Sequence, residues 1–124
     1  MEYNSLLTQD AHESGAEINI INPVTGEPTD FFITVMGVDS KEWRMSVKKV
    51  TRAYLSDGIM TEEKEIDSEV DQLVSITKDW RGINRNGEEL KFSKEECRQL
   101  YTKSPGVLQQ VDRFVADRRN FTKG

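Results

Sequence analysis

The stretch Phe31-Phe32-Ile33-Thr34-Val35-Met36 decides how this chain of 124 residues begins to fold. Its β-branched and aromatic residues favour a strand, in which Phe31, Ile33 and Val35 share one face because strand side chains alternate. Upstream, residues 17–21 alternate as a second short strand, and a segment rich in Asn, Pro, Thr and Gly separates the two. The sequence therefore predicts a two-stranded hairpin. A lone hairpin is only marginally stable, so we expect helices to cover it.

A first helix is predicted directly after this hairpin. Gly37-Val38 breaks the strand, and Asp39 followed by Glu42 has the spacing of a capping box, which marks a helix start. The helix is expected to end at Ser56-Asp57-Gly58. The apolar stripe expected to face the core consists of Trp43, Val47, Val50 and Tyr54.

A second helix is predicted from Thr61 to the residues before Gly82. Glu62 and Glu63 in its first turn suit the helix dipole. At Gly82 we expect the chain to turn where a Cβ atom would clash. The apolar stripe of this helix consists of Ile66, Val70, Leu73, Thr77 and Trp80.

Two shorter helices are predicted in the last third of the chain. Asn86-Gly87 indicates a type I′ turn, in a tiny hairpin or a loop. Ser93 then opens one helix by capping-box spacing to Glu96, and Pro105 suits the first position of another. The inward-facing residues of these helices are Cys97, Leu100, Tyr101, Leu108, Val111, Phe114 and Val115.

The predicted fold is α+β, with an N-terminal two-stranded β-hairpin packed on about four α-helices in a single domain. We expect residues 1–16 to be a flexible N-terminal arm, 17–121 the folded domain, and 122–124 a polar tail. A mass of 14.2 kDa is the size of one domain.

Composition indicates a soluble intracellular protein. The 22 acidic and 17 basic residues give a net charge of −5, which disfavours a nucleic-acid footprint. One cysteine excludes an internal disulfide framework and fits a reducing cytoplasm. No signal-peptide pattern is recognised at the start, and no apolar run approaches the roughly 18 residues of a membrane span.

The sequence predicts no catalytic, cofactor or metal site. The single histidine, His12, lies in the expected arm, where nothing would position it as a general base. No nucleophile elbow, phosphate-binding loop, paired histidines or paired cysteines occur. Cys97 lies on an apolar stripe and is expected in the core. We therefore expect a protein that is not an enzyme.

Charge segregation is the strongest functional signal in the residues themselves. Between Asp57 and Asp71 seven acidic residues accompany the single Lys64. This segment is either a solvated helix face or a docking surface for a basic partner, with Glu63, Asp67 and Asp71 as its candidate residues.

The C-terminal end is basic. Arg113, Arg118, Arg119 and Lys123 lie around Phe121. They can bind a partner protein. Binding to a nucleic acid is less consistent with the net acidity of the chain. We take Arg118, Arg119 and Phe121 as candidate partner-binding residues. A chain that is acidic in the middle and basic at its end can also pair with its own copies, as a homo-oligomer.

The order of caps, turns and packing stripes resembles that of one protein family, over about residues 18–121. The resemblance is carried, in chain order, by Asn22-Pro23-Val24-Thr25-Gly26, Gly37-Val38-Asp39-Ser40-Lys41-Glu42-Trp43-Arg44, Asp79-Trp80-Arg81-Gly82-Ile83, Phe92-Ser93-Lys94-Glu95-Glu96-Cys97 with Leu100-Tyr101, Pro105 with Leu108-Gln109-Gln110-Val111, and Asp117-Arg118-Arg119-Asn120-Phe121. The chain resembles the tail assembly chaperones of long-tailed, lambda-like bacteriophages and prophages.

This resemblance implies a non-enzymatic protein of the host bacterial cytoplasm that is not part of the finished virion. It implies binding to the tape measure protein, a long helical ruler that such a chaperone keeps soluble while tail tube subunits are recruited. In many members a ribosomal frameshift yields a longer product that engages the tail tube protein, and this chain would be the short form. No cofactor, nucleic acid or membrane is implied.

Two alternatives from other classes stay open on the sequence. One is a small structural neck or tail-completion adaptor of a phage virion, which mass spectrometry of purified virions would detect. The other is a nucleic-acid-binding regulator that uses the basic C-terminal residues, which a salt-dependent gel shift would detect.

Overall fold

A three-stranded antiparallel sheet forms one layer of the computed structural model, which describes residues 1–58 and 61–122. Its strands are β1 (Ala16–Ile21), β2 (Pro28–Val35) and β3 (Thr77–Arg81), with β2 in the centre. Ile18 lies opposite Ile33, and Ile33 lies opposite Trp80. The expected hairpin is therefore confirmed, and a third strand that the sequence analysis did not predict extends it.

Alternation along β2 separates the core face of the sheet from its open face. Phe31, Ile33 and Val35 are buried, as predicted. On the other face the Arg81 guanidinium lies 4.1 Å from the centre of the Phe32 ring and donates two hydrogen bonds of 2.9 Å to Glu17. A sheet with one buried and one polar face is typical of antiparallel strands.

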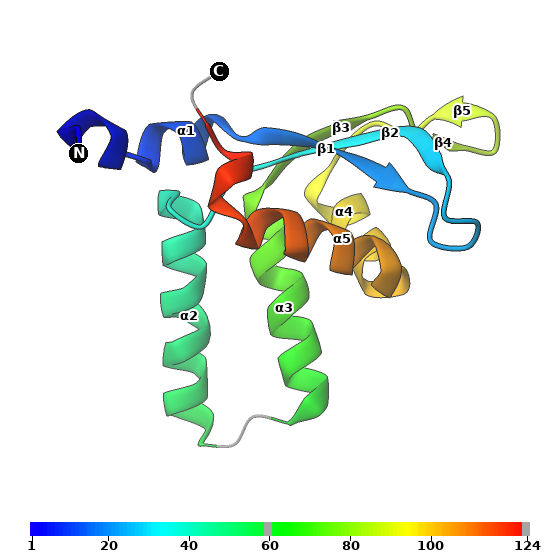
Figure 1. Ribbon diagram of the computed structural model, residues 1–124. Helices are drawn as coiled ribbons and strands as arrows, with labels where there is room; N and C mark the ends of the chain where they lie inside the picture. The colour runs from blue at the N-terminus through cyan, green and yellow to red at the C-terminus, as the bar shows by residue number, and fades with distance from the viewer. Residues whose placement is uncertain (59–60, 123–124) are drawn as a thin grey trace.

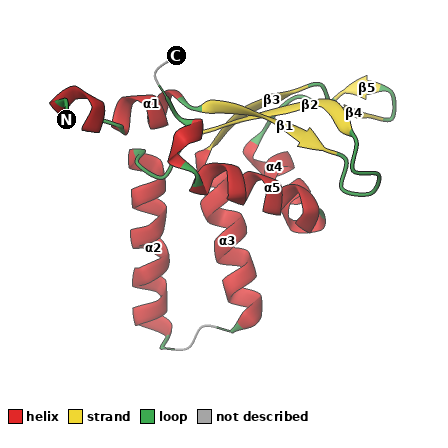
Figure 2. Ribbon diagram, viewed as in Figure 1, coloured by secondary structure: helices red, strands yellow, loops and turns green. Residues whose placement is uncertain are grey.

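The helices lie mainly on the core side of the sheet (Figure 2). The α-helices are α1 (Gln9–Ser14), α2 (Lys41–Asp57), α3 (Glu62–Ile76), α4 (Lys94–Lys103) and α5 (Pro105–Ala116); the short elements are β4 (Asn84–Arg85), β5 (Glu88–Glu89) and the 3-10 turns η1 (Tyr3–Leu6) and η2 (Arg118–Asn120). In the described part of the chain no helix is long and apolar enough to cross a membrane. The architecture is a small α+β domain.

The second predicted helix is five residues too long at its C-terminal end. α3 ends at Ile76, and Thr77–Arg81 is strand β3. Thr77 and Trp80 were expected on a helical stripe, but Trp80 instead faces the core from the sheet, between Phe31 and Phe92. The spacing of the apolar residues is compatible with either a helix or a strand over these residues, and pairing with β2 favours the strand.

A polar cluster, buried at Thr77 and Tyr101, holds the junction between α3 and β3. The Thr77 hydroxyl donates to the Leu73 carbonyl and lies 2.8 Å from the Tyr101 hydroxyl. The Lys94 ammonium donates to the carbonyls of Val74 and Thr77 at 2.8 and 2.7 Å. These bonds satisfy groups that a helix end leaves without partners, and burial lowers the pKa of Lys94.

The tiny second hairpin is present as β4 and β5. Asn86 and Gly87 have φ values of 53° and 83°, the left-handed conformations of a type I′ turn, so the Asn-Gly prediction is confirmed. Beside this hairpin the Trp80 indole N–H donates to the Leu90 carbonyl at 2.9 Å, which satisfies its buried donor.

The prediction of a flexible arm over residues 1–16 is wrong for its second half. Residues Gln9–Ser14 form α1, and His12 is fully buried, stacked on Phe121 with 4.8 Å between ring centres. The His12 carbonyl accepts from Gly37 N–H and its Nδ1 accepts from Asp39 N–H, both at 3.0 Å. The packed domain therefore starts before residue 17, because a partner distant in sequence fixes the segment.

The two ends of the chain meet at Asp39, which we call the terminal clasp together with Thr8, His12, Arg118 and Phe121. The Thr8 hydroxyl donates to Asp39 at 2.6 Å, and the Arg118 guanidinium donates to it at 3.0 to 3.2 Å. These bonds hold the pKa of Asp39 below its usual range, with Arg118 as the main cause. Asp39 is not the helix cap that was predicted.

The adjacent Ser40 caps α2 instead: its hydroxyl accepts from Trp43 N–H at 3.2 Å. The cap is thus displaced by one residue from the predicted capping box, which leaves the Asp39 carboxylate available to the terminal clasp.

The clasp predicts a pH-dependent stability. Burial lowers the pKa of His12 below its usual value of 6.5, while Asp39 opposes this shift and Arg118 adds to it. The unfolded chain then binds a proton more readily than the folded one. We expect the free energy of unfolding to fall as the pH decreases below about 6.5, by at most about 1.4 kcal/mol per pH unit. Urea unfolding at about pH 7 and pH 5 measures this loss.

The matched variant is His12→Asn, whose side-chain oxygen can still accept from Asp39 N–H but does not titrate in this range. It should be less stable than the natural chain and lose most of the pH dependence between these two values. Asp39 contributes to a separate window, because a carboxylate with a lowered pKa loses its stabilising effect only at more acidic pH. An unchanged pH dependence in the variant would assign the effect to other groups.

Candidate functional site

A pair of helices projects from the domain. α2 and α3 run side by side away from the sheet, and their far ends project beyond the other helices (Figure 1). Ser40 caps the start of α2, Gly58 ends it with φ of 76°, and the Thr61 hydroxyl caps α3 by accepting from Lys64 N–H. Local capping thus defines both helices, which we call the α2–α3 hairpin.

The projection leaves α2 without a buried side chain among its described residues. Trp43 and Val50 of the predicted stripe are half-buried, but Val47 and Tyr54 are exposed. The expectation that this stripe faces the core is therefore confirmed for Trp43, which packs against the core, and wrong for Val47 and Tyr54. The apolar periodicity predicted the helix correctly, but the rest of the domain does not extend far enough to cover all of its apolar side chains.

Further apolar side chains on the hairpin point away from the core. Met45 is 64% exposed, Leu55 75% and Ile66 57%. Exposed apolar groups gathered on one projecting element are typical of an interaction surface, whereas single ones are ordinary. Sequence periodicity gave no indication of Met45 and Leu55, because both lie off the predicted stripe.

The two helices of the hairpin carry opposite charge. α2 contains five basic and two acidic residues, and α3 contains one basic and six acidic residues. Six of the seven acidic residues in the segment predicted from the sequence therefore lie on α3, beside a basic helix, and Asp57 is the last residue of α2. Each helix alone creates a potential that attracts groups of the opposite sign.

The predicted acidic residues differ in their surroundings. Glu63 and Asp67 are exposed on α3, one turn apart. Asp71 lies on the same line of the helix, but it forms an ion pair with Arg98 of α4. Two of the three candidates therefore remain accessible, and the third is bound to the body of the domain. Its partner is 27 positions away and could not be read from the local sequence.

The candidate partner-binding residues near the C-terminus contact other residues of the same domain. Arg118 pairs with Asp39 in the terminal clasp, and Arg119 donates to Asp117 at 2.8 Å. Phe121 is only 4% exposed and contacts His12 and Phe114. The prediction of Phe121 as a partner-binding residue is corrected: it packs into the core. Lys123 lies outside the described residues.

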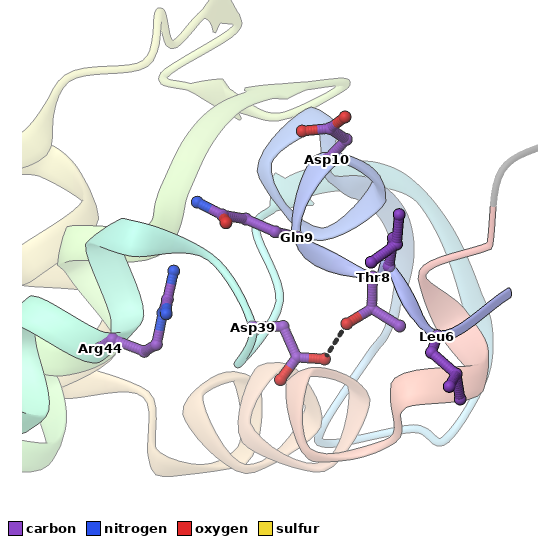
Figure 3. A pocket seen from close by; sticks show the side chains of 7 residues that line it. Leu6, Thr8, Gln9, Asp10, Asp39 and Arg44 are labelled. Carbon is purple, nitrogen blue, oxygen red and sulfur yellow. Dashed lines mark hydrogen bonds between the residues drawn. The ribbon is translucent and has the colours of Figure 1, made fainter. Parts of the chain in front are cut away.

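Open depressions on the described surface include two in which a carboxylate already has a partner. The first, about 410 Å³, is lined by Leu6, Gln9, Asp39 and Arg44 among others (Figure 3). Its carboxylate, Asp39, already accepts from Thr8 and Arg118. The second, about 520 Å³, lies between Trp80 and α4, where Arg85 pairs with Glu96.

The side chains that can ligate metals lie scattered over the described residues, and the single cysteine lies in the core. No group of three or more His, Cys, Asp or Glu side chains gathers there as a metal site. Cys97 is buried as predicted, and burial raises the pKa of its thiol, which disfavours the reactive thiolate. Of the surfaces described, the α2–α3 hairpin is the candidate functional site.

Comparison with known proteins adds no family to this geometry. No protein-family model matches the chain, and neither a curated protein nor a solved structure matches it.

Proposed function

We propose that this protein is a tail assembly chaperone of a long-tailed bacteriophage or prophage, and that the α2–α3 hairpin binds the tape measure protein. The order of sequence motifs over residues 18–121 supports the family. The single structural observation that supports the mode of action is the projecting hairpin, with exposed Glu63 and Asp67 and half-covered apolar side chains on its helices. The chaperone acts in the host cytoplasm and is absent from the finished virion.

The chemistry of the hairpin suits a long amphipathic helix. Such a helix exposes apolar side chains until its final partners cover them, and it aggregates through them. Val47 and Tyr54 offer apolar contacts on α2. Glu63 and Asp67 attract basic side chains, which accelerates encounter and disfavours acidic partners. Recognition of a helix through apolar and charged contacts of this type needs no catalytic group.

Neutralising the acidic row should weaken the capture of the tape measure protein. We expect Glu63→Gln combined with Asp67→Asn to raise the dissociation constant by about three- to tenfold, because exposed charge pairs each contribute up to about 1 kcal/mol. The binding of the natural chain should also weaken as salt rises. Co-expression followed by quantitative affinity capture measures both effects.

The matched control is Glu88→Gln with Glu89→Gln on β5, which removes the same charge from an exposed strand far from the hairpin. It should capture the tape measure protein as the natural chain does. Equal capture by both variants would mean that the acidic row is only solvated. Asp71 is left unchanged, because removing it would also break its ion pair with Arg98.

Virion composition separates this proposal from the adaptor alternative. Mass spectrometry of purified particles should detect no copies of a chaperone, whereas a neck or tail-completion adaptor would be present in fixed number. The longer frameshifted product that would engage the tail tube protein stays a prediction. A slippery heptamer followed by an overlapping reading frame in the gene would support it.

A further inference from the structure

One side of α2 carries two basic side chains with an apolar side chain at either end. Met45, Lys48, Arg52 and Leu55 are spaced by 3, 4 and 3 residues, so they lie along one line of the helix. All four are exposed. No ion pair joins Lys48 or Arg52 to a described side chain. We call these four residues the basic seam.

The basic seam points away from the body of the domain. Consecutive residues of a helix are turned by about 100°, so Lys48 and Arg52, each two positions from Val50, lie about 200° around the helix from it. Val50 is half-buried, and Trp43, which lies opposite Met45 by the same count, packs against the core. A partner can therefore reach the seam without displacing a packed element of the domain.

The spacing of the seam identifies a helix as its occupant. Residues that recur every 3 and 4 positions face a single partner helix, as the a and d positions of a coiled coil do. A helix that lies in a membrane surface instead needs an uninterrupted apolar sector. Lys48 and Arg52 occupy the centre of this sector, between Met45 and Leu55, so the seam lacks that pattern.

Charge identifies the chemistry of the occupant. All the basic residues of α2 lie within a sector of about 140° that includes the seam. They are Lys41, Arg44, Lys48, Lys49 and Arg52. The whole chain has a net charge of −5 and α3 is acidic, so the rest of the molecule repels a nucleic acid or an anionic bilayer that extends beyond α2. A single acidic helix contacts α2 alone and avoids this repulsion.

The end of the seam nearest the sheet adjoins an apolar hollow. Arg44, next to Met45 in the chain, lines the depression of about 410 Å³ together with Leu6 and Leu7. Both leucines are exposed over about half of their surface. An apolar side chain of a helix lying along the seam can enter this depression, which extends the apolar contact beyond α2.

We propose that the basic seam of α2 binds an acidic amphipathic helix of a partner protein. The acidic side chains of that helix pair with Lys48 and Arg52, and its apolar side chains cover Met45 and Leu55. The apolar part contributes roughly 25 cal/mol for each Å² of surface removed from water. This partner is opposite in charge to the one that the acidic row of α3 attracts, so the inference does not rest on the proposed function.

A designed peptide supplies a defined probe. The acidic peptide carries leucine, glutamate, glutamate and leucine at the spacing of the seam, and it is about 25 residues long so that it can form a helix in water. A scrambled peptide of the same composition has the same charge without the helical pattern. At about 0.15 M salt, calorimetry should show that the natural chain binds the acidic peptide at least about tenfold more tightly than the scrambled peptide.

Charge reversal on α2 locates the contact. Lys48→Glu with Arg52→Glu should raise the dissociation constant of the acidic peptide at least about tenfold, equal to about 1.4 kcal/mol. The matched control is Lys49→Glu with Lys91→Glu, two exposed positions off the seam. It makes the same change in net charge and should raise the dissociation constant less than about threefold, because salt screens distant charges. Circular dichroism confirms that both variants are folded.

Four results would overturn the proposal. The first is equal binding of the acidic and scrambled peptides, and the second is an equal loss of binding in the seam variant and its control. The third is tighter binding of a single-stranded oligonucleotide or of phosphatidylserine vesicles than of the acidic peptide, which would assign the seam to another class of partner. The fourth is a dimer of the natural chain in sedimentation velocity that the seam variant abolishes, which would assign the seam to a second copy.

Discussion

Gly82→Ala is expected to lower the free energy of unfolding by about 3 kcal/mol or more, a large part of the roughly 5 to 15 kcal/mol that stabilises a typical domain. Gly82 has φ of +82°, and an added Cβ atom would lie 1.8 Å from the backbone carbonyl oxygen of Asp30. That oxygen belongs to β2, so the clash can be relieved only by moving the central strand away from the end of β3. The sequence-based expectation of a turn at Gly82 that excludes a Cβ is confirmed.

Gly26→Ala is the matched control for this variant. Gly26 has a similar φ of +76°, but no atom outside its chain neighbours lies within 4 Å of the added Cβ. The free energy of unfolding of this variant should therefore fall by only about 1 to 2 kcal/mol, the cost of placing alanine in the left-handed region. Urea unfolding of both variants separates backbone strain from the clash. Equal losses at the two positions would show that the β2–β3 junction relaxes without cost.

Phe121→Ala is expected to cost about 3 kcal/mol of stability and to lower the melting temperature by roughly 10 °C. The side chain is buried against His12 and Phe114, and it connects the end of the chain to α1. Its removal leaves a cavity in the terminal clasp and exposes the His12 ring, so both ends of the chain should become sensitive to protease. Thermal unfolding and limited proteolysis measure these effects.

Two further variants distinguish packing from partner binding at Phe121. Tyr3→Ala removes an exposed aromatic side chain near the other end of the chain and should leave the melting temperature nearly unchanged. Phe121→Leu retains much of the apolar volume, so it should fold at moderate temperature and capture the tape measure protein as the natural chain does. Loss of capture by a folded Phe121→Leu variant would restore this residue as a binding contact.

The candidate site was predictable in part. Its charge was evident, because the acidic residues of α3 are clustered between Glu62 and Asp71 and their helical spacing follows from a helix that starts at Thr61. Its shape was not. The sequence indicates an apolar stripe on α2, but only the tertiary structure shows that Val47 and Tyr54 on this stripe remain exposed.

Long-range pairs explain the remaining differences at charged positions. Asp71 and Arg118 were candidates for a partner, yet each finds a partner in its own chain, 27 and 79 positions away. Charge type and helical phase are local properties, whereas the identity of the ion-pair partner depends on how distant elements are brought together.

The sequence by itself determined the elements whose hydrogen bonds close within a few residues: the strand alternation of β2, the Asn86-Gly87 turn and the starts of α3, α4 and α5. Only the tertiary structure decided that Thr77–Arg81 leaves the helix to pair with β2, and that Gln9–Ser14 docks through His12. The physical reason is the range of the stabilising contact. Caps and turns satisfy backbone groups locally, but a strand edge or a buried ring is stabilised only by a partner that the chain supplies from far away.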